Sequence, residues 1–336
     1  MKKNILIIGN QGYVGTKLTQ VIDYSKYNVS CIDIGLFKNC NLYRSTKEKC
    51  FKQNYSDVRR IKDNILKNQD IIIYLAAISN DPMGEKFKKI TNEINYKSCI
   101  NIAKRAKKFG TKSFIFASSC SVYGTEGAKM KKENNKLNPL TVYAKTKVLS
   151  EKKLKLISSN KFKVLCLRFA TACGESPRLR LDLVLNDFVF SALKTKEIKI
   201  LSDGSPLRPL IDVKDMALAI QYGFDFKKLK NFTCVNAGSN KWNFKVIDLA
   251  KKVSAVLGGI KINFASNSPA DKRSYMVNFS EFKKIAPKFY PKTKIEDTII
   301  QLKNKLVYKN VKKINKKNYI RLDVLNKKIN SKYIKT

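Results

Sequence analysis

The chain of 336 residues predicts an α/β fold, with a doubly wound parallel sheet and a smaller C-terminal α/β region. Short apolar runs alternate with helical patterns through the first 170 residues, and a glycine-rich turn joins the first run to the first helical pattern. Such alternation implies right-handed crossovers and a sheet covered on both faces. Hydrophobic residues make up 43% of the chain, enough to form a core although 28% of the residues are charged.

The predicted strands are short and largely apolar, as buried parallel strands would be. The first five cover residues 4–8, 29–34, 71–78, 113–117 and 162–169. We expect helices after the glycine turn as far as residue 22, and at 93–109 and 143–158. Beyond residue 170 the pattern is less regular. A strand at 231–238 is predicted to return to the sheet, and a helix at 246–257 to end at a pair of glycines.

Positive charge dominates the composition, with 68 Lys or Arg against 26 Asp or Glu and a formal net charge of +42. Such an excess often indicates a nucleic-acid or anionic-membrane partner. The lysines are spread over the whole chain, however, without an RNA-recognition, zinc-finger or helix-turn-helix motif. We therefore assign most of the excess to solvated faces and expect no specific nucleic-acid partner.

Histidine is absent, which excludes Ser-His-Asp and Cys-His nucleophile systems and His-ligated zinc. Acid–base chemistry must then use Tyr, Lys, Cys, Asp or Glu. The eight cysteines show no C-x-x-C spacing, so we expect neither a redox pair nor a metal site. The apolar runs are too short to span a bilayer, and we expect no secretory leader and a reducing, cytoplasmic location.

The glycine-rich turn has G-x-x-G-x-x-G spacing, at Gly9, Gly12 and Gly15. Glycine there permits a tight turn, close approach of the backbone to a pyrophosphate, and close helix–strand packing. Tyr13 and Val14 begin the helix, whose N-terminal N–H groups would face the phosphates. A lone glycine motif is weak evidence, so the residues that follow it decide its meaning.

Asp33 follows the last of these glycines by 18 residues, at the end of the second predicted strand. A carboxylate there accepts hydrogen bonds from the adenosine ribose and repels a 2′-phosphate. The combination predicts a Rossmann-type domain that binds NAD rather than NADP. Asp57 and Val58 begin the next segment. Asp57 could contact the adenine or act as an ordinary helix cap, and the sequence favours neither.

A second candidate site is Tyr143, with Lys147 one helical turn later. Tyrosine normally titrates near ~10. A nearby ammonium group, with an oxidised nicotinamide, would stabilise the phenolate and make Tyr143 a usable base near neutral pH. The spacing alone means little, since Y-x-x-x-K occurs five times. Tyr143 is distinguished because it opens a helix 24 residues after Ser119, which ends the fourth predicted strand.

Residues 118–124 have the sequence S-S-C-S-V-Y-G. With the glycine loop before it and Y-x-x-x-K after it, this segment resembles the extended short-chain dehydrogenase/reductases, specifically the NAD-dependent nucleotide-sugar epimerase/dehydratase family. The resemblance spans residues 3–300. It implies a Rossmann domain that carries NAD, and a smaller region that binds a nucleoside-diphosphate sugar.

The resemblance also implies the domain boundaries. Residues 1–170 form the NAD-binding domain, with a return of the chain at about 205–245, and residues 171–204 and 246–300 form the substrate-binding region. Residues 301–336 form a basic C-terminal extension, which could make weak contact with an anionic surface. We also expect a homodimer that pairs the helices at 93–109 and 143–158 of each subunit.

Positions within the motifs suggest roles for single residues. Ser119 resembles the family's catalytic Ser/Thr, and Tyr143 and Lys147 resemble its base and the lysine that lowers the pKa of that base. Ala76-Ala77 matches the strand end that lines the cofactor, and Asn95 matches an asparagine in the following helix. The expected substrate-binding residues are Thr171, Arg178, Arg180, Asn186, Arg208 and Arg273. Arginine suits a diphosphate because its planar guanidinium group can bind two oxygens at once. The alternative for each of these arginines is a surface ion pair.

Departures from the family pattern reduce the number of reactions that the chain could catalyse. Its dehydratases carry an Asp-Glu pair after the catalytic Thr, where this chain has Cys120 and Ser121, so no acid stands ready there and 4,6-dehydration is disfavoured. Its 3,5-epimerases use a Cys two residues before the Tyr, whereas Cys120 stands three before Tyr123, which favours a packed thiol. Asp212-Val-Lys-Asp215 replaces a frequent His-Val-x-Asp and could alter substrate choice.

The favoured hypothesis is a 4-epimerase. Tyr143 would take the proton of the C4 hydroxyl, NAD would take the hydride and return it to the other face, and Ser119 would stabilise the alkoxide-like oxygen. One alternative is an oxidoreductase, a 4-dehydrogenase or 4-ketoreductase, with the same residues. Another is a non-catalytic Rossmann protein that binds RNA or an anionic membrane.

Overall fold

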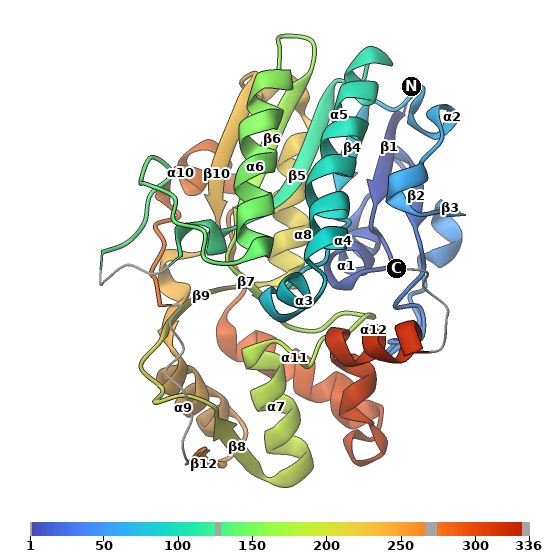
Figure 1. Cartoon of the computed structure of the whole chain (residues 1–336). Helices are drawn as coiled ribbons and strands as arrows, with labels where there is room; N and C mark the ends of the chain where they lie inside the picture. Colours follow the sequence, from blue (N-terminus) through green and yellow to red (C-terminus); the bar gives the residue numbers. More distant parts are fainter. Residues whose placement is uncertain (1, 125–128, 266–273, 331–336) are drawn as a thin grey trace.

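A seven-stranded, wholly parallel sheet forms the centre of the computed structural model, which describes residues 2–124, 129–265 and 274–330 (Figure 1). The strand order is β10-β6-β5-β4-β1-β2-β3. The bounds are β1 (Lys3–Ile8), β2 (Tyr27–Asp33), β3 (Lys52–Tyr55), β4 (Ile71–Tyr74), β5 (Ser113–Ser119), β6 (Lys163–Phe169) and β10 (Phe232–Ala237). The chain runs outward from β1 to β3 and then crosses back to β4, which creates a switch point at the carboxyl ends of β1 and β4. The predicted doubly wound fold is confirmed.

Helices cover both faces of the sheet. Successive residues of β1 face opposite sides, so Ile5 and Ile7 pack with α1 (Tyr13–Val21) and α8 (Val213–Gln221), whereas Leu6 and Ile8 pack toward α5 (Cys99–Lys108) and α6 (Val142–Ile157). Both faces are thus buried, which explains why these strands are continuous apolar runs.

Several elements differ from the sequence prediction. The strand predicted at 71–78 is shorter, because β4 ends at Tyr74. The edge strand β3 was not predicted, because its sequence K-Q-N-Y is polar and partly exposed, as an edge strand permits. The helix predicted at 93–109 continues from α4 (Lys88–Asn92) through a π-helical turn (Glu93–Ser98) into α5. The π turn contains Asn95, whose side chain makes reciprocal hydrogen bonds of 2.9 and 3.0 Å with the backbone of Ile78. This contact fixes the chain that leaves β4 toward the site.

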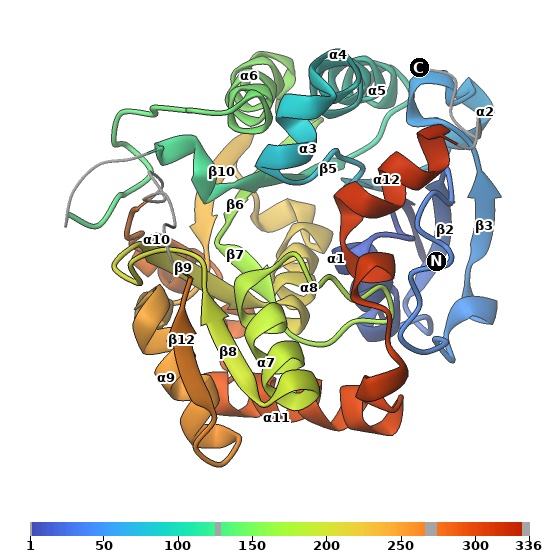
Figure 2. The same cartoon turned by 60° about the horizontal axis from the view of Figure 1, so that its bottom comes forward.

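The C-terminal half adds a second hydrophobic core below the sheet, built from α7 (Val184–Thr195), α9 (Val246–Val256) and α11 (Ile295–Tyr308). Two small sheets accompany it, one of β7 (Thr171–Cys173), β9 (Leu207–Asp212) and β11 (Asn243–Lys245), the other of β8 (Glu197–Ile200) and β12 (Lys261–Phe264). Much of the predicted basic extension packs on the body, with Leu302, Leu306 and Ile314 buried, although Tyr308 is 79% exposed. The last helix, α12 (Arg321–Asn330), runs back beside α3 (Asp81–Lys86) (Figure 2).

Within the described ranges, no helix combines the length and apolarity needed to cross a membrane. The same ranges contain no cluster of three or more Cys, Asp or Glu side chains placed to hold a metal ion.

Candidate active site

A large cavity of about 1080 Å³ opens at the carboxyl ends of the central strands. Its volume exceeds the ~300–1,000 Å³ usual for one small ligand, which suits two ligands side by side. The predicted residues that line it are Gly9, Gly12, Tyr13, Val14, Gly15, Asp33, Asp57, Val58, Ala76, Ala77, Ser119, Tyr143, Lys147, Thr171, Arg180 and Arg208. The glycine loop and the predicted catalytic residues therefore face the same space.

The three glycines of the loop are required for different reasons, and together these reasons indicate a dinucleotide site. Gly9 has φ +96°, and a Cβ there would lie 2.5 Å from the backbone nitrogen of Ala76. A Cβ on Gly15 would lie 2.3 Å from the carbonyl oxygen of Gly9. At Gly12, by contrast, a Cβ would have no protein neighbour closer than 3.4 Å, and this residue precedes α1 without a side-chain cap. A diphosphate close to the helix N-terminus accounts for glycine at this position.

Asp33 ends β2 beside this loop. Its carboxylate accepts hydrogen bonds from the backbone N–H of Gln11 (3.0 Å) and Gly35 (2.8 Å), one to each oxygen. Burial raises the pKa of Asp33, while these hydrogen bonds and the charge of Arg178 lower it. Each carboxylate oxygen keeps a further lone pair, so the group can still accept a ribose hydroxyl.

Asp57 borders the cavity with Val58 but also acts as a cap. It accepts the backbone N–H of Arg59 at 2.9 Å and forms an ion pair with the Arg59 guanidinium at 2.7 Å. The capping interpretation is thus observed, and a contact with adenine stays a prediction.

The start of α6 positions Tyr143. Thr141 precedes the helix, and its hydroxyl accepts the backbone N–H of Ala144 at 3.2 Å, so Tyr143 lies in the first turn. Lys147, one turn later, places its Nζ 5.4 Å from the centroid of the Tyr143 ring. The ammonium donates to the carbonyl of Ala117 at 2.6 Å, which ties α6 to β5 just before Ser119.

The protein alone holds Tyr143 protonated at neutral pH. Burial and, next to it, the charge of Asp81 raise the pKa of Tyr143 to about 12, against the lowering effect of a hydrogen bond with Ser119. Burial lowers the pKa of Lys147 to about 8. A positive charge brought close to the phenol, such as that of an oxidised nicotinamide, would favour the phenolate.

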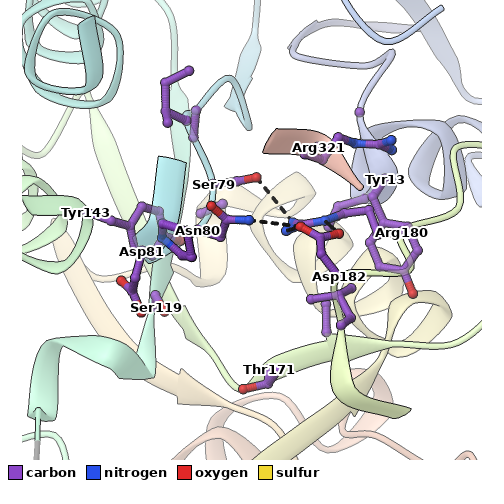
Figure 3. A pocket seen from close by; sticks show the side chains of 18 of the residues that line it. Tyr13, Ser79, Asn80, Asp81, Ser119, Tyr143, Thr171, Arg180, Asp182 and Arg321 are labelled. Carbon is purple, nitrogen blue, oxygen red and sulfur yellow. Dashed lines mark hydrogen bonds and ion pairs between the residues drawn. The ribbon is translucent and has the colours of Figure 1, made fainter. Parts of the chain in front are cut away.

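Asp81 is a site residue that sequence reasoning missed. It begins α3, lines the cavity, and accepts the hydroxyl of Thr141 at 2.6 Å. Figure 3 shows Asp81 beside Ser119 and Tyr143 on one wall of the cavity. The sequence predicted no ready acid because the two positions after Ser119 hold no carboxylate. Asp81 instead follows β4, the neighbouring strand. Its only sequence signal is its place shortly after β4, where ligands of α/β sheets bind.

The predicted substrate-binding residues are only partly brought together. Thr171 and Arg208 line the cavity, as does Arg180, which forms an ion pair of 2.8 Å with Asp182 on the wall opposite Tyr143 (Figure 3). Asn186 is fully buried and does not line the cavity.

The other two predicted arginines, Arg178 and Arg273, are not among the described residues that line the cavity. Arg178 borders a smaller polar cleft of about 450 Å³ outside the glycine loop. Arg273 lies outside the described residues. The Asn186 amide donates to Tyr13 Oη and Arg180 O and accepts the Gly174 N–H, so its polar groups are engaged within the protein.

An interior ion pair supports the site from behind. Arg168 on β6 and Glu151 on α6 are both buried and make a contact of 2.8 Å. Glu151 also accepts the hydroxyl of Ser118, the residue before Ser119, and Arg168 donates to the Tyr123 hydroxyl at 3.0 Å. These contacts join β5, β6 and α6 under the catalytic residues.

Of the departures from the family pattern, Ser121 lines the cavity, whereas Cys120, Asp212 and Asp215 lie in the interior. Cys120 is buried, burial raises its pKa well above the usual value, and its Sγ contacts the Arg168 carbonyl at 3.1 Å, as expected of a packed thiol. Asp212 is buried and accepts the Thr298 hydroxyl at 2.7 Å. Asp215 is also buried and accepts the backbone N–H of Thr293 at 3.2 Å. None of the three lines the cavity within the described part of the chain.

Comparison with known proteins agrees with the family that the sequence motifs resemble. The model of the NAD dependent epimerase/dehydratase family matches residues 5–237. A curated relative from Bacillus subtilis (strain 168), the uncharacterized UDP-glucose epimerase YtcB, is 28% identical over 264 residues, which are 74% of this chain and 82% of the relative.

Solved structures show the same fold. The UDP-N-acetylglucosamine 4-epimerase of Methanobrevibacter ruminantium M1 superposes with a TM-score of 0.81 at 23% identity, covering 92% of this chain and 99% of that one. The UDP-glucose 4-epimerase of Bifidobacterium longum, solved with NAD+ and UDP, has a TM-score of 0.77 at 20% identity and covers 93% and 100% of the two chains.

Proposed function

The chain belongs to the NAD-dependent epimerase/dehydratase family, and from its cavity we propose that it is a nucleotide-sugar 4-epimerase acting by transient oxidation at C4. One observation carries the proposal. The glycine loop and the group of Ser119, Tyr143 and Lys147 line the same cavity, which has room for a dinucleotide beside a second ligand. A phenol, an ammonium group and a hydroxyl at the cofactor site are the groups that oxidation of a secondary alcohol requires.

Each of these residues has a distinct role in the proposed reaction. Tyr143 accepts the proton of the C4 hydroxyl and later returns it. Ser119 donates a hydrogen bond to the same oxygen as negative charge develops on it. Lys147 carries a positive charge near the Tyr143 ring and thereby favours the phenolate. NAD, when bound, would supply the acceptor for the hydride from C4 and the donor for its return.

The relatives suggest where to begin with substrates. Both the Bacillus relative and the Bifidobacterium structure are named for UDP-glucose, so UDP-glucose is the first probe. Arg180 and Arg208 line the cavity and place positive charge beside it for the diphosphate, with the Nε and Nη2 of Arg180 already donating to Asp182. We also propose the homodimer, since α5 and α6 pack side by side and α6 exposes Leu149 (44%) and Leu156 (76%).

The test is incubation of the protein with UDP-glucose and NAD, followed by NMR of the sugar and absorbance at 340 nm. A 4-epimerase gives UDP-galactose without net absorbance change, whereas a growing absorbance identifies the oxidoreductase alternative. A 4-keto-6-deoxy sugar would instead make Asp81 an acid in an elimination.

Substitution of the proposed base completes the test. Tyr143→Phe should lower kcat by about 10²- to 10⁴-fold, the usual contribution of a general base. Tyr308→Phe is the matched control, because Tyr308 has the same Y-x-x-x-K spacing but is 79% exposed. Near-full turnover by Tyr143→Phe would refute the assignment.

A further inference from the structure

The C-terminal helix α12 lies over the cofactor end of the cavity, and we propose that its Arg321 binds the diphosphate of NAD, so that α12 acts as a clasp on the cofactor. The inference rests on NAD being the cofactor, and it holds whether the sugar is epimerised or oxidised. It gives a function to part of the basic segment that the sequence assigned to anionic surfaces.

Contacts at both ends hold α12 across the opening. On one side, the hydroxyl of Tyr319, just before the helix, donates to the carbonyl of Asn41 at 3.0 Å, in the segment that follows β2. On the other side, Lys86 of α3 donates to the side chain of Asn326 at 2.8 Å. Between them, Leu325 is buried in a small apolar cluster with Ile78 and Met83. The helix therefore bridges the segments that follow β2 and β4, between which a dinucleotide would lie.

Arg321 is the first residue of α12 and lines the cavity. Its side chain is 2% exposed and stacks on the Phe37 ring, with 4.7 Å between the guanidinium carbon and the ring centroid. One terminal nitrogen, Nη2, donates to the carbonyl of Arg178 at 2.7 Å, whereas Nη1 is buried without a hydrogen-bond partner. A buried guanidinium with an unmade hydrogen bond is costly unless a ligand completes it. Figure 3 shows Arg321 near Arg180 and Tyr13, the first residue of α1.

A chain of hydrogen bonds joins Arg321 to the glycine loop. Arg178, whose carbonyl accepts from Arg321, donates through its own guanidinium to the side chain of Gln11 at 2.7 Å. Gln11 belongs to the glycine loop, and its backbone N–H donates to Asp33 at 3.0 Å. Like Arg321, Arg178 is buried, and two of its guanidinium nitrogens lack partners. The cluster is thus placed at the adenosine and diphosphate end rather than at the Tyr143 end.

The local charge also favours an anion. Arg178, Arg180 and Arg321 are all buried, and Asp182 is paired with Arg180. Burial, together with the charges of Arg180 and Arg178, lowers the pKa of Arg321 to about 10. A diphosphate at the N-terminus of α1 would supply the compensating charge for Arg321. The hydrogen-bond chain leads to the glycine loop, where the diphosphate of the cofactor would lie, so the cofactor is the better match.

The experiment measures binding directly, without turnover. Calorimetry or NMR titration of R321Q, R321K and the wild-type chain would use NAD, ADP-ribose and adenosine as ligands. We expect R321Q to bind NAD and ADP-ribose about 10- to 100-fold more weakly, the usual effect of losing a charge-assisted hydrogen bond, and adenosine almost unchanged. R321K keeps the charge but loses the fork, so its affinity should be intermediate, and it also serves if R321Q does not fold. K327A is the matched control, because Lys327 is an exposed cation of the same helix.

Two results would overturn the proposal. Unchanged NAD affinity in R321Q, or in R321K if only that variant folds, would remove Arg321 from the cofactor site. Equal losses for adenosine and ADP-ribose would mean that α12 is only a structural cover. Neither result depends on which sugar reaction the enzyme performs, so failure here and failure of the epimerase assignment are separate findings.

Discussion

Replacing Asp81 with Asn should lower the pKa of Tyr143 and shift the acidic limb of the pH–rate profile to lower pH. Burial is the main cause of the raised pKa of about 12, and the charge of Asp81 is the next. At pH 7 this pKa corresponds to a cost of about 7 kcal/mol for forming the phenolate, at 1.36 kcal/mol per unit. Removing the negative charge reduces that cost.

The sign follows from the role of Tyr143 as a base. The active form is deprotonated, so a lower pKa means that the limb appears at lower pH, and each unit of decrease gives a tenfold faster rate at a fixed pH on the limb. Asn at position 81 keeps an acceptor for the Thr141 hydroxyl, which preserves the cap of α6. The assay is kcat/KM for conversion of UDP-glucose across the limb.

The matched control is Glu85→Gln, in the same short helix. Glu85 accepts the backbone N–H of Val142, next to Tyr143, but is not among the charges that raise the pKa of Tyr143. The reasoning is refuted if the Asp81→Asn limb stays in place or moves to higher pH, or if Glu85→Gln shifts it as far.

Three further predictions follow from the packing. Gly12→Ala should leave stability nearly unchanged and weaken NAD binding. Gly15→Ala should lower the melting temperature, because its Cβ would lie 2.3 Å from the carbonyl oxygen of Gly9. Equal effects of the two variants in thermal melts and NAD titrations would contradict this. Arg168→Met should cost about 3–5 kcal/mol in urea unfolding by leaving Glu151 buried without its partner, and Glu151→Met added to it should recover most of that loss; no recovery would count against the pair. Leu149→Glu with Leu156→Glu should give monomers in light scattering, and a dimer that persists would place the interface elsewhere.

The sequence predicts best what depends on local pattern. The glycines at 9, 12 and 15 and the alternating apolar runs carry their own steric and burial requirements, so they define the sheet and the cofactor loop. The segment around Ser119 and the helix that starts near Tyr143 locate the proposed base for the same reason. Strand β3 could not be predicted from the sequence, because an edge strand needs no apolar run.

Residues that reach the site from distant segments could not be predicted. Asp81 is near Ser119 and Tyr143 only because the strands β4 and β5 are neighbours in the sheet. The basic composition of residues 301–336 suggested an extension that makes weak contact with an anionic surface. The spacing of Leu322, Leu325 and Ile329 is typical of an apolar helix face, but it does not indicate which surface the helix covers. Asn186 matched a substrate-contacting position, yet its amide is engaged by Tyr13, Gly174 and Arg180.

The most direct test of the central claim uses UDP-glucose carrying deuterium at C4. The account predicts that the UDP-galactose product retains the deuterium at C4 even in ordinary water, that no absorbance accumulates at 340 nm, and that Tyr143→Phe abolishes the conversion. Loss of the deuterium to solvent, or retention of full conversion by Tyr143→Phe, would contradict a cycle in which Tyr143 moves the proton while C4 is oxidised by hydride transfer to NAD and then reduced again.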